Sequence, residues 1–433
     1  MGISARELAD RTPATRDRYV DLLRVASLGV VVLGHWLMAA VTADGAIGNL
    51  LAVVPELQVV TWVFQVMPVF FFVGGFAHAL AHRSRPRYAA FLRARLQRLL
   101  RPTMVFVAVW GALALAVQLL GADRGLTGVA LRLVAQPLWF IGIYLAMVAL
   151  TPPLLKLHER YGWGAFGALV AAAAAVDALR FAADVPYVEF LNFAFVWLAV
   201  HQLGFLRADG MLRLPGALAA AGLAGAGLLV AFGPYPLSMV GMPGEKVSNM
   251  APPTLALLCH GLWLVGAVEL LRGPGTRLVA RAGVWHKVVA ANGIAMTAFL
   301  WHLTAMLGVY GALLALGRGL PEPATAAWWA QAPLRLAAAA ALTALLVAVF
   351  RRFERPAPAA PASGAGGPVA ALGITLALFG VLGLSMVGFG GLLEGRTALL
   401  VAVRVSAPAA VAMALAGWLL VERAGRAGRA GRA

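Results

Sequence analysis

Arg24 and His35 are two ionisable residues inside the first long apolar segment of the chain, and they lie eleven residues apart. Eleven residues of α-helix turn through about 1100°, which is three turns plus roughly 20°, so both side chains leave the same helix face. They are then about 16 Å apart along the helix axis. Either group is costly in hydrocarbon, so the pair predicts a functional site within a membrane. The alternative is a snorkelling arginine and a packed core histidine.

A second basic pair, Arg95 and Arg98, lies in the most basic stretch of the chain, residues 83–102. The two arginines are one helical turn apart and project together. Each guanidinium offers a planar fork of donors, which suits a phosphate group. Spacing alone leaves an equal alternative, in which the stretch is a positive-inside signal on an interfacial helix.

The composition places both pairs in a polytopic membrane protein. The 433 residues are 61% hydrophobic and only 12% charged, whereas a soluble chain would carry about twice that share of charge. The one cysteine, Cys259, excludes an internal disulfide and a cysteine-based metal site. Phosphate-binding loops, dinucleotide fingerprints and nucleophile elbows do not occur, so the sequence predicts neither metal-dependent nor nucleotide-hydrolysing chemistry.

Twelve apolar stretches predict an all-α, polytopic transmembrane helical bundle. The predicted spans cover residues 20–41, 57–81, 103–120, 137–155, 162–179, 187–206, 214–233, 253–271, 289–316, 333–350, 369–391 and 398–421. Polar groups within them include His201 and Glu269, which lie deep in their spans and have no partner that the sequence assigns.

Basic residues gather on alternate loops between these spans. Of the 35 Lys and Arg, 26 fall on the side that holds the N-terminus and 7, including Arg335, on the other, while Arg24 and Arg404 fall inside spans. This asymmetry predicts a multi-pass protein of the plasma membrane with both termini in the cytoplasm. The net charge of +17 is interpreted as topology, and no nucleic-acid partner is predicted.

A stretch rich in Pro, Ala and Gly at residues 356–368 breaks the apolar pattern. The predicted parts are a cytoplasmic N-terminal tail, a ten-span body, a linker, a two-span accessory tail and a disordered basic C-terminus that can contact lipid, at residues 1–18, 19–356, 357–368, 369–421 and 422–433. Arg404 is the exception in the tail, and it either belongs to the site or pairs with Glu394 or a lipid phosphate.

Several short segments follow one another in a characteristic order. They are Asp21–Arg24 with His35, Met67–Phe76 in the second span, Arg95–Arg98 with Pro102, Pro137–Gly142, Asn292–His302 and Phe353–Pro356. The ordered set covers about residues 16–356 and resembles the acyltransferase-3 family of integral membrane acyltransferases. Two departures are Gly74, where many relatives carry serine, and the two spans beyond the usual ten.

The resemblance implies transfer of an acyl group, usually acetyl from acetyl-CoA, to a hydroxyl of a glycan or another small acceptor, without a metal. His35 would act as the base or as a transient acyl carrier, with Arg24 on the same helix face. Arg95, Arg98 and Arg24 would hold the phosphates of acyl-CoA at the cytoplasmic rim. The roughly 16 Å between Arg24 and His35 is comparable to an extended pantetheine arm.

Two other classes of function compete with this interpretation. A twelve-span transporter or flippase could use the arginine and histidine sites for an anionic substrate, and a membrane scaffold would use neither. Inverted repeats and paired broken helices would favour a transporter, and the sequence shows neither.

Overall fold

The computed structural model describes residues 5–13, 15–84, 87–121, 126–242, 244–317, 319–354 and 367–424. These residues form helices almost throughout, with two short two-stranded sheets, β1–β2 and β3–β4. The predicted all-α fold is therefore confirmed. The predicted linker lies outside the described residues up to residue 366, and the predicted basic C-terminus does so from residue 425.

Ten helices of the described part are long and apolar enough to cross a membrane. These candidate spans are Arg18–Met38, Pro55–Ser84, Ala94–Leu119, Thr127–Tyr161, Trp163–Ala182, Val188–Ala208, Pro215–Phe232, Ala295–Ala315, Ala326–Phe353 and Pro368–Val387. A bent pair, Leu255–Leu270 with Arg272–Ala280, adds an eleventh span if its 53° bend lies within one crossing. The twelfth predicted span contains only a shorter apolar helix, Ala407–Glu422. The chain is a multi-pass membrane protein.

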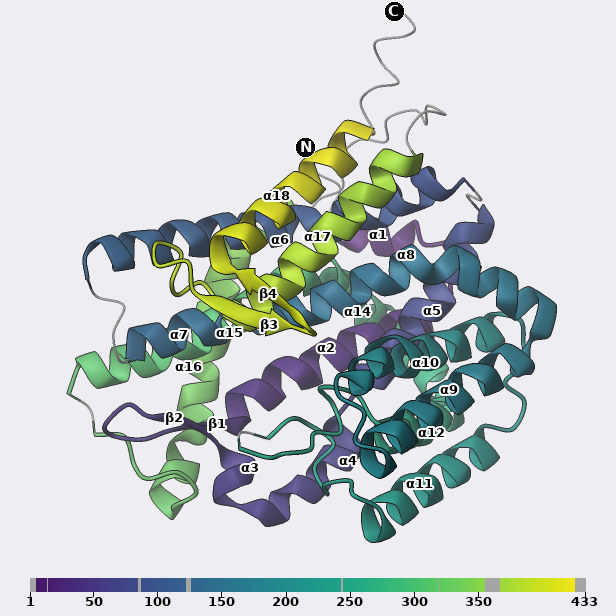
Figure 1. Ribbon diagram of the computed structural model, residues 1–433, viewed down its shortest axis with the longest axis horizontal. Coiled ribbons are helices and arrows are strands. Elements are labelled where there is room, and N and C mark those ends of the chain that lie inside the picture. The colour runs from purple at the N-terminus through teal and green to yellow at the C-terminus, as the bar shows by residue number, and fades with distance from the viewer. Residues whose placement is uncertain are drawn as a thin grey trace, which may run out of the picture. The chain divides into compact units, whose positions relative to one another are not determined.

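The chain divides into two compact units, of which the first contains residues 1–40, 48–80 and 153–295. Its elements are α1 (Ala5–Asp10), α2 (Arg18–Met38), α3 (Leu50–Val53), η1 (Pro55–Val60), α4 (Thr61–Phe64), most of α5 (Met67–Ser84), α9 (Trp163–Ala182), η2 (Val188–Leu191), α10 (Asn192–Ala208), α11 (Pro215–Phe232), α12 (Leu255–Leu270), α13 (Arg272–Ala280) and α14 (Ala282–Asn292). The short strands β1 (Ala39–Val41) and β2 (Ile47–Asn49) follow α2. Figure 1 labels most of these elements.

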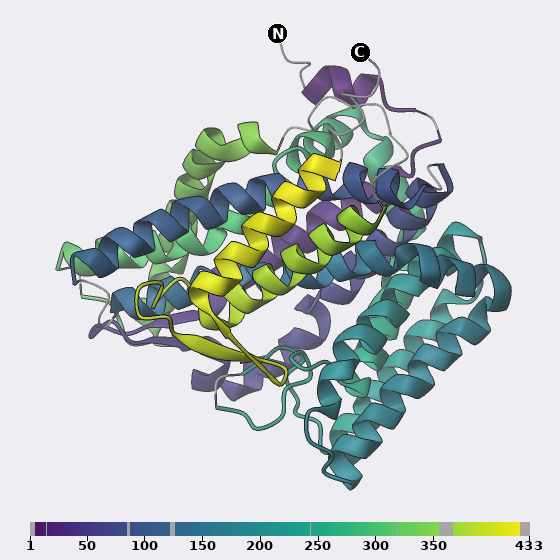
Figure 2. The same ribbon diagram turned by 45° about the horizontal axis from the view of Figure 1, so that its top comes forward.

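Helices α9 to α12 pack side by side in the first unit (Figure 2). Helix α5 joins them by lying very close to α10, because glycines replace side chains at the contact. A Cβ on Gly75 would lie 1.8 Å from the carbonyl oxygen of His201, and one on Gly204 would lie 2.3 Å from the backbone of α5. The apolar Met67–Phe76 segment thus positions α5 against α10 through backbone contact.

The second unit contains residues 41–47, 81–152 and 296–433. Its elements are α6 (Tyr88–Leu119), α7 (Leu126–Leu133), most of α8 (Pro137–Tyr161), α15 (Ala295–Ala315), α16 (Ala326–Phe350), η3 (Arg351–Phe353), α17 (Gly367–Val387), β3 (Thr397–Leu400), β4 (Val403–Ser406) and α18 (Ala407–Ala424). Helix α6 runs without interruption through Pro102. Residues 88–102 of the basic stretch, which we expected to precede span three, therefore form the beginning of the same helix.

Aromatic side chains form the centre of the second unit. Phe106 of α6 meets Trp301 of α15 edge to face, and Trp301 stacks on Phe350 with ring centroids 4.1 Å apart. Phe389, which follows α17, is fully buried and contacts the rings of Phe106 and Trp110. Rings of this size contribute most of the buried apolar area of such a core.

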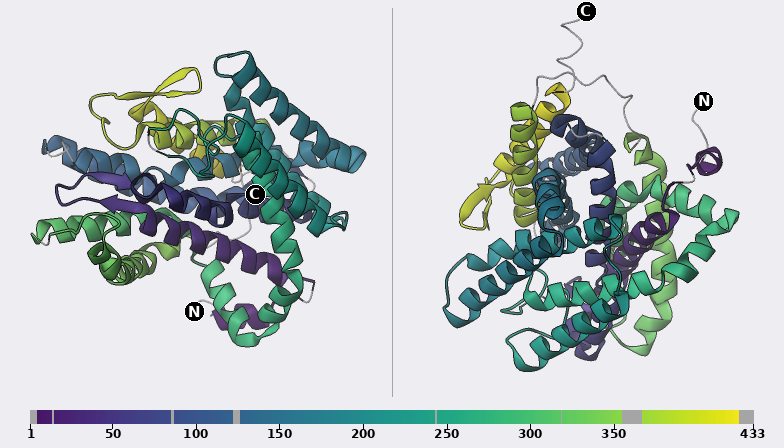
Figure 3. Two further views of the ribbon diagram at one scale, coloured as in Figure 1. Left: turned by 90° about the horizontal axis from the view of Figure 1, so that it is seen from below. Right: turned by 90° about the vertical axis from the view of Figure 1, so that its right-hand side faces the viewer.

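The tail helices α17 and α18 lie side by side as a hairpin, joined by β3 and β4 (Figure 3). Glycines again allow the contact, since a Cβ on Gly380 or Gly417 would lie 2.3 Å from the backbone of the partner helix. Both helices also contact α6. Whether residues 369–421 act only as an accessory stays a prediction.

Three arginines lie elsewhere than the sequence predicted. Arg404 lies on β4, paired across the hairpin with Leu399, rather than inside a span. Arg335, expected in a loop, is buried within α16, where its guanidinium lies over the Trp328 ring and donates to the Trp328 carbonyl. Arg207, also expected in a loop, is buried in the last turn of α10. Hydropathy misplaced Arg335 and Arg207 in loops, because the long apolar stem of an arginine lets its charge lie within a helix.

Candidate active site

His35 lies in the last turn of α2, since the helix ends at Met38. We expected it near the middle of the span. Its side chain is exposed, and its Nδ1 lies 2.8 Å from the carbonyl oxygen of Val31, one turn earlier. A carbonyl oxygen can only accept, so Nδ1 carries the proton and Nε2 is the nitrogen with the lone pair in the neutral ring. This contact orients an imidazole whose Nε2 can act as a base or nucleophile.

Arg24 lies on the same helix and forms an ion pair one turn back along it. Its Nη1 is 3.0 Å from Oδ1 of Asp21, and Asp21 is almost fully buried. The same carboxylate accepts two hydrogen bonds from Arg16, at 2.6 Å from Nε and 3.1 Å from Nη2. Our sequence reasoning noted Asp21 only as part of a motif and missed its pairing with Arg24, although a spacing of three residues is the signal of a helical ion pair.

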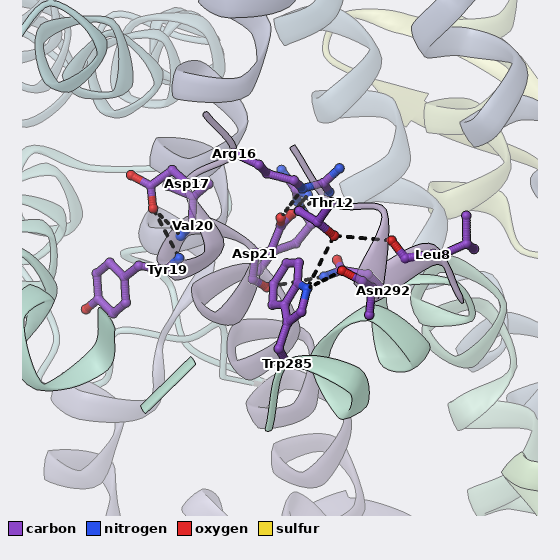
Figure 4. A network of polar contacts seen from close by, with 11 residues as sticks. Leu8, Thr12, Arg16, Asp17, Tyr19, Val20, Asp21, Trp285 and Asn292 are labelled. Atoms are coloured by element: carbon purple, nitrogen blue, oxygen red, sulfur yellow. Dashed lines mark hydrogen bonds and ion pairs between the residues drawn. The ribbon is translucent and has the colours of Figure 1, made fainter. Parts of the chain in front are cut away.

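The beginning of α2 is fixed by its own cap and by neighbouring helices. Asp17 accepts from the N–H groups of Tyr19 and Val20, which caps the first turn. Figure 4 shows Asp21 close to Arg16 and to Asn292 at the end of α14, whose amide lies 3.5 Å from the Asp21 carbonyl oxygen.

Helix α1 is docked on α14 by Trp285, whose ring is buried. The indole N–H contacts both the Ala9 carbonyl and the Thr12 hydroxyl, each at 3.3 Å (Figure 4). Asp10 also pairs with His286, at 3.1 Å. Part of the predicted N-terminal tail is therefore a helix that packs on α14, a few residues before Arg16.

A second ion-pair cluster connects α2 with α10 and α12. Arg207 of α10 binds Glu269 of α12 at 2.6 Å and Asp17 at 2.9 Å, and its guanidinium lies over the Phe76 ring. Glu269 therefore has the partner that the sequence did not assign. Each charged group of the cluster has a partner of opposite sign, and with two carboxylates and one guanidinium the cluster connects the ends of three helices.

The other deep residue, His201, also finds its partner within the first unit. Its Nε2 lies 3.0 Å from Nδ1 of His78, and both side chains are fully buried. The two rings meet where Gly75 brings α5 against the backbone of α10. The partners are 123 residues apart in sequence, so no spacing rule could join them.

Arg95 and Arg98 lie on one turn of α6, in the second unit, whereas Arg24 and His35 lie in the first. The Arg95 side chain is half-buried and that of Arg98 is exposed. Pro102 has no N–H for the carbonyl of Arg98, four residues earlier, yet the helix continues through it to Leu119. The two arginines therefore belong to the same helix as span three.

Two of the motif segments meet in the second unit. The Glu354 carboxylate accepts from the Met296 N–H at 3.0 Å, the Thr297 N–H at 2.9 Å and the Thr297 hydroxyl at 2.6 Å. It therefore caps the first turn of α15, the helix that carries His302. Burial raises the pKa of Glu354, and these hydrogen bonds partly offset the shift.

Within the described ranges, no three His, Cys, Asp or Glu side chains are grouped so that they could hold a metal ion. The predicted site residues supply one imidazole, that of His35, which a backbone carbonyl orients, and three arginines. Such a set suits proton transfer or acyl transfer near an anionic ligand.

Comparison with known proteins supports a group-transfer enzyme. The sequence profile of a family described as an acyltransferase domain matches residues 17–352, more than three quarters of the chain. No curated protein and no solved structure matches the chain significantly. The matched stretch contains α2, the basic turn of α6 and α15. The chain belongs to this acyltransferase family and is a membrane acyltransferase.

Proposed function

We propose that the protein is an O-acyltransferase that moves an acyl group, with acetyl expected, from acyl-CoA to a hydroxyl of a glycan or another small acceptor. We place it in the plasma membrane with both termini in the cytoplasm. The observation that carries the proposal is the hydrogen bond from His35 Nδ1 to the Val31 carbonyl, at 2.8 Å. This hydrogen bond orients the imidazole and places its proton on Nδ1, so that Nε2 carries the lone pair. Arg24 lies on the same helix.

In the first route, Nε2 of His35 accepts the hydroxyl proton as the acceptor oxygen attacks the thioester carbonyl. The tetrahedral intermediate collapses, the carbon–sulfur bond breaks, and the imidazolium returns its proton to the thiolate of CoA. In the second route, Nε2 attacks the thioester itself, the carbon–sulfur bond breaks, and the thiolate of CoA leaves behind an acyl-imidazolium. The acceptor hydroxyl then attacks the acyl carbon, the carbon–nitrogen bond breaks, and the hydroxyl proton passes to the thiolate of CoA. Both routes need Nε2 unprotonated, and both are balanced without a metal or a redox partner.

Arginines supply the complement to the donor. The phosphates of acyl-CoA are anionic, and the guanidinium forks of Arg24, Arg95 and Arg98 suit them better than lysines would. A position of these groups near the cytoplasmic rim would leave the pantetheine arm to carry the thioester toward His35. The family membership does not favour a transporter, which would need no acyl donor.

The test is turnover by purified protein in detergent, supplied with acetyl-CoA and a mixture of polyols and glycans. Released thiol and acylated product are measured together. We expect His35→Ala to lower kcat by at least about 10²-fold, the usual contribution of a general base. His286→Gln is the matched control, because His286 lies on α14 and pairs with Asp10, and it should keep wild-type turnover.

Two results would contradict the proposal. Substantial turnover by well-folded His35→Ala protein would remove His35 from the chemistry. An absence of thiol release by wild-type protein with every acceptor would favour a transporter or scaffold.

A further inference from the structure

One carboxylate, that of Asp21, holds two arginines at the beginning of α2. Arg16 binds it through Nε and Nη2, and Arg24 binds it through Nη1. The Asp21 side chain is only 5% exposed, whereas those of Arg24 and Arg16 are 25% and 52% exposed. The cluster carries one positive charge in excess, and its arginines are more exposed than its carboxylate.

Arg24 uses only one edge of its guanidinium in this pair. Among the described residues, Asp21 is its hydrogen-bonding partner, and the bond engages Nη1. The edge formed by Nε and Nη2 is the one that binds two oxygens of a carboxylate or phosphate side by side. Asp21 thus leaves Arg24 oriented, partly exposed and able to bind a second anion.

Arg16 restrains Asp21 in turn. Its two parallel hydrogen bonds fix the plane of the carboxylate, and the pairing raises the pKa of Arg16. The residues before it are anchored through Thr12 and Ala9 to Trp285 of α14. Arg16 lies one residue before the stretch that matches the family, so this restraint comes from outside the recognised domain.

We propose that Asp21 is a positioning residue that aims the Nε–Nη2 edge of Arg24 at a phosphate of the acyl-CoA donor, and that Arg16 is a second positioning residue that holds Asp21. This inference rests on the proposed function, because it assumes a phosphate-bearing acyl donor. It assigns roles to two residues that do not themselves touch the substrate.

Orientation and charge make opposite predictions for this cluster. Replacing Asp21 by asparagine removes a negative charge, which by itself would attract a phosphate more strongly. The same change loosens Arg24, which would weaken a bidentate contact. The sign of the change in donor affinity therefore tells whether Asp21 positions Arg24 or only offsets its charge.

The experiment compares acetyl-CoA with acetyl-pantetheine, which carries the same thioester but no phosphate, in detergent so that lipid phosphate does not compete. For Asp21→Asn we expect the KM for acetyl-CoA to rise about tenfold, since a charge-assisted hydrogen bond contributes about that factor. We expect kcat with acetyl-CoA and kcat/KM with acetyl-pantetheine to stay within roughly twofold of wild type. In an Arg24→Ala background, Asp21→Asn should add nothing.

A second variant keeps the test independent of the folding of Asp21→Asn. Arg16 is half exposed, so Arg16→Gln should fold, and it should raise the KM for acetyl-CoA selectively. Arg11→Gln is its control, because Arg11 is an exposed charge on the same segment.

Each outcome decides something specific. Equal losses with both donors, tighter acetyl-CoA binding by Asp21→Asn, or equal effects of Arg16→Gln and Arg11→Gln would overturn the inference and leave the acyltransferase proposal intact. A wild-type protein that turns over neither donor would instead overturn the proposed function and the inference with it.

Discussion

At the residue scale, the ionisable groups of this protein lie in two kinds of surroundings. Arg207 pairs with Glu269 and with Asp17, and their side chains are largely buried. Arg24 and Arg16 share one carboxylate and keep exposed donors, and His35 has one nitrogen fixed by a backbone carbonyl. The second kind is the one that can exchange partners with a ligand, because its two arginines keep donors on side chains that are partly exposed.

Arg95 and Arg98 provide a test of donor recognition on α6. Replacing either by alanine should raise the KM for acetyl-CoA about tenfold, because one charge-assisted contact to phosphate is lost. Lysine should restore little of the affinity, since it lacks the planar fork. Arg87→Ala is the matched control, because Arg87 is an exposed charge that precedes the same helix. Wild-type donor affinity in Arg95→Ala and Arg98→Ala would leave the basic turn a topological role only.

Glu354 gives a prediction about stability. Glu354→Ala removes the cap of α15 and should lower the free energy of unfolding by about 1–2 kcal/mol. Glu354→Gln should cost less, because its amide oxygen can still accept from an N–H of the first turn. Thermal unfolding in detergent measures both variants, and an equal loss in the two would contradict the capping role.

The raised pKa of Glu354 also sets a pH dependence. Its pKa in the folded protein lies above its ordinary value of 4.5, so in the interval just above that value the folded protein binds more protons than the unfolded chain. Its contribution to stability must then decrease as the pH rises through this interval. We expect Glu354→Gln to remove this part of the pH dependence of Tm. A steeper dependence in the variant would contradict the assignment.

The sequence shows the charged and titratable residues of the candidate site but few of their partners. His35 and Arg24 are visible as ionisable residues in an apolar segment, and Arg95 and Arg98 as a pair one turn apart in a basic stretch. Asp21 was within reach of the helical spacing rule, whereas the pairs His78–His201 and Arg207–Glu269 join residues 123 and 62 positions apart. Such pairs depend on which helices become neighbours, and hydropathy does not specify neighbours.

At the scale of elements, glycine decides how closely helices approach. Gly75→Ala would place a methyl group against the backbone of His201, and a backbone cannot move aside as a side chain can. We expect a loss of about 1–3 kcal/mol in the free energy of unfolding. Gly167→Ala on α9 is the control, because nothing lies within 4 Å of its added Cβ, and it should be neutral or slightly stabilising. Equal melting temperatures for the two variants would show that α5 and α10 are not so close.

The elements that the sequence misjudged lie where apolar residues do not form a long helix. Residues 398–405 are apolar enough to extend the last predicted span, but they form the β3–β4 hairpin, and α18 begins at Ala407. A short apolar run fits a strand as well as a helix. The break between α12 and α13 was likewise invisible, because Leu270 and Leu271 continue the apolar pattern up to the bend.

At the scale of the whole molecule, the predicted topology can be tested directly. Reporter fusions after residues 45, 90, 240 and 360 should read outside, inside, outside and inside. The bias of basic residues toward one side carries this expectation. The bias does not depend on Arg207 and Arg335, which lie in helices rather than in loops, or on Arg404, which lies in a hairpin. Reporters that respond only inside and only outside the cell should give complementary signals. A different alternation would refute the predicted orientation.

Two stabilising residues, Arg16 and Glu354, lie just outside the two ends of the recognised domain, which matters for expression of a fragment. The match starts one residue after Arg16, which restrains Asp21, and stops two residues before Glu354, which caps α15. A fragment trimmed to residues 17–352 would keep every motif segment except Phe353–Pro356, and it would lose the Arg16–Asp21 ion pair at one end and the Glu354 cap of α15 at the other. The stretch that matches the family, residues 17–352, is therefore shorter than the stretch that contains the contacts of α2 and α15, which extends at least from Arg16 to Glu354.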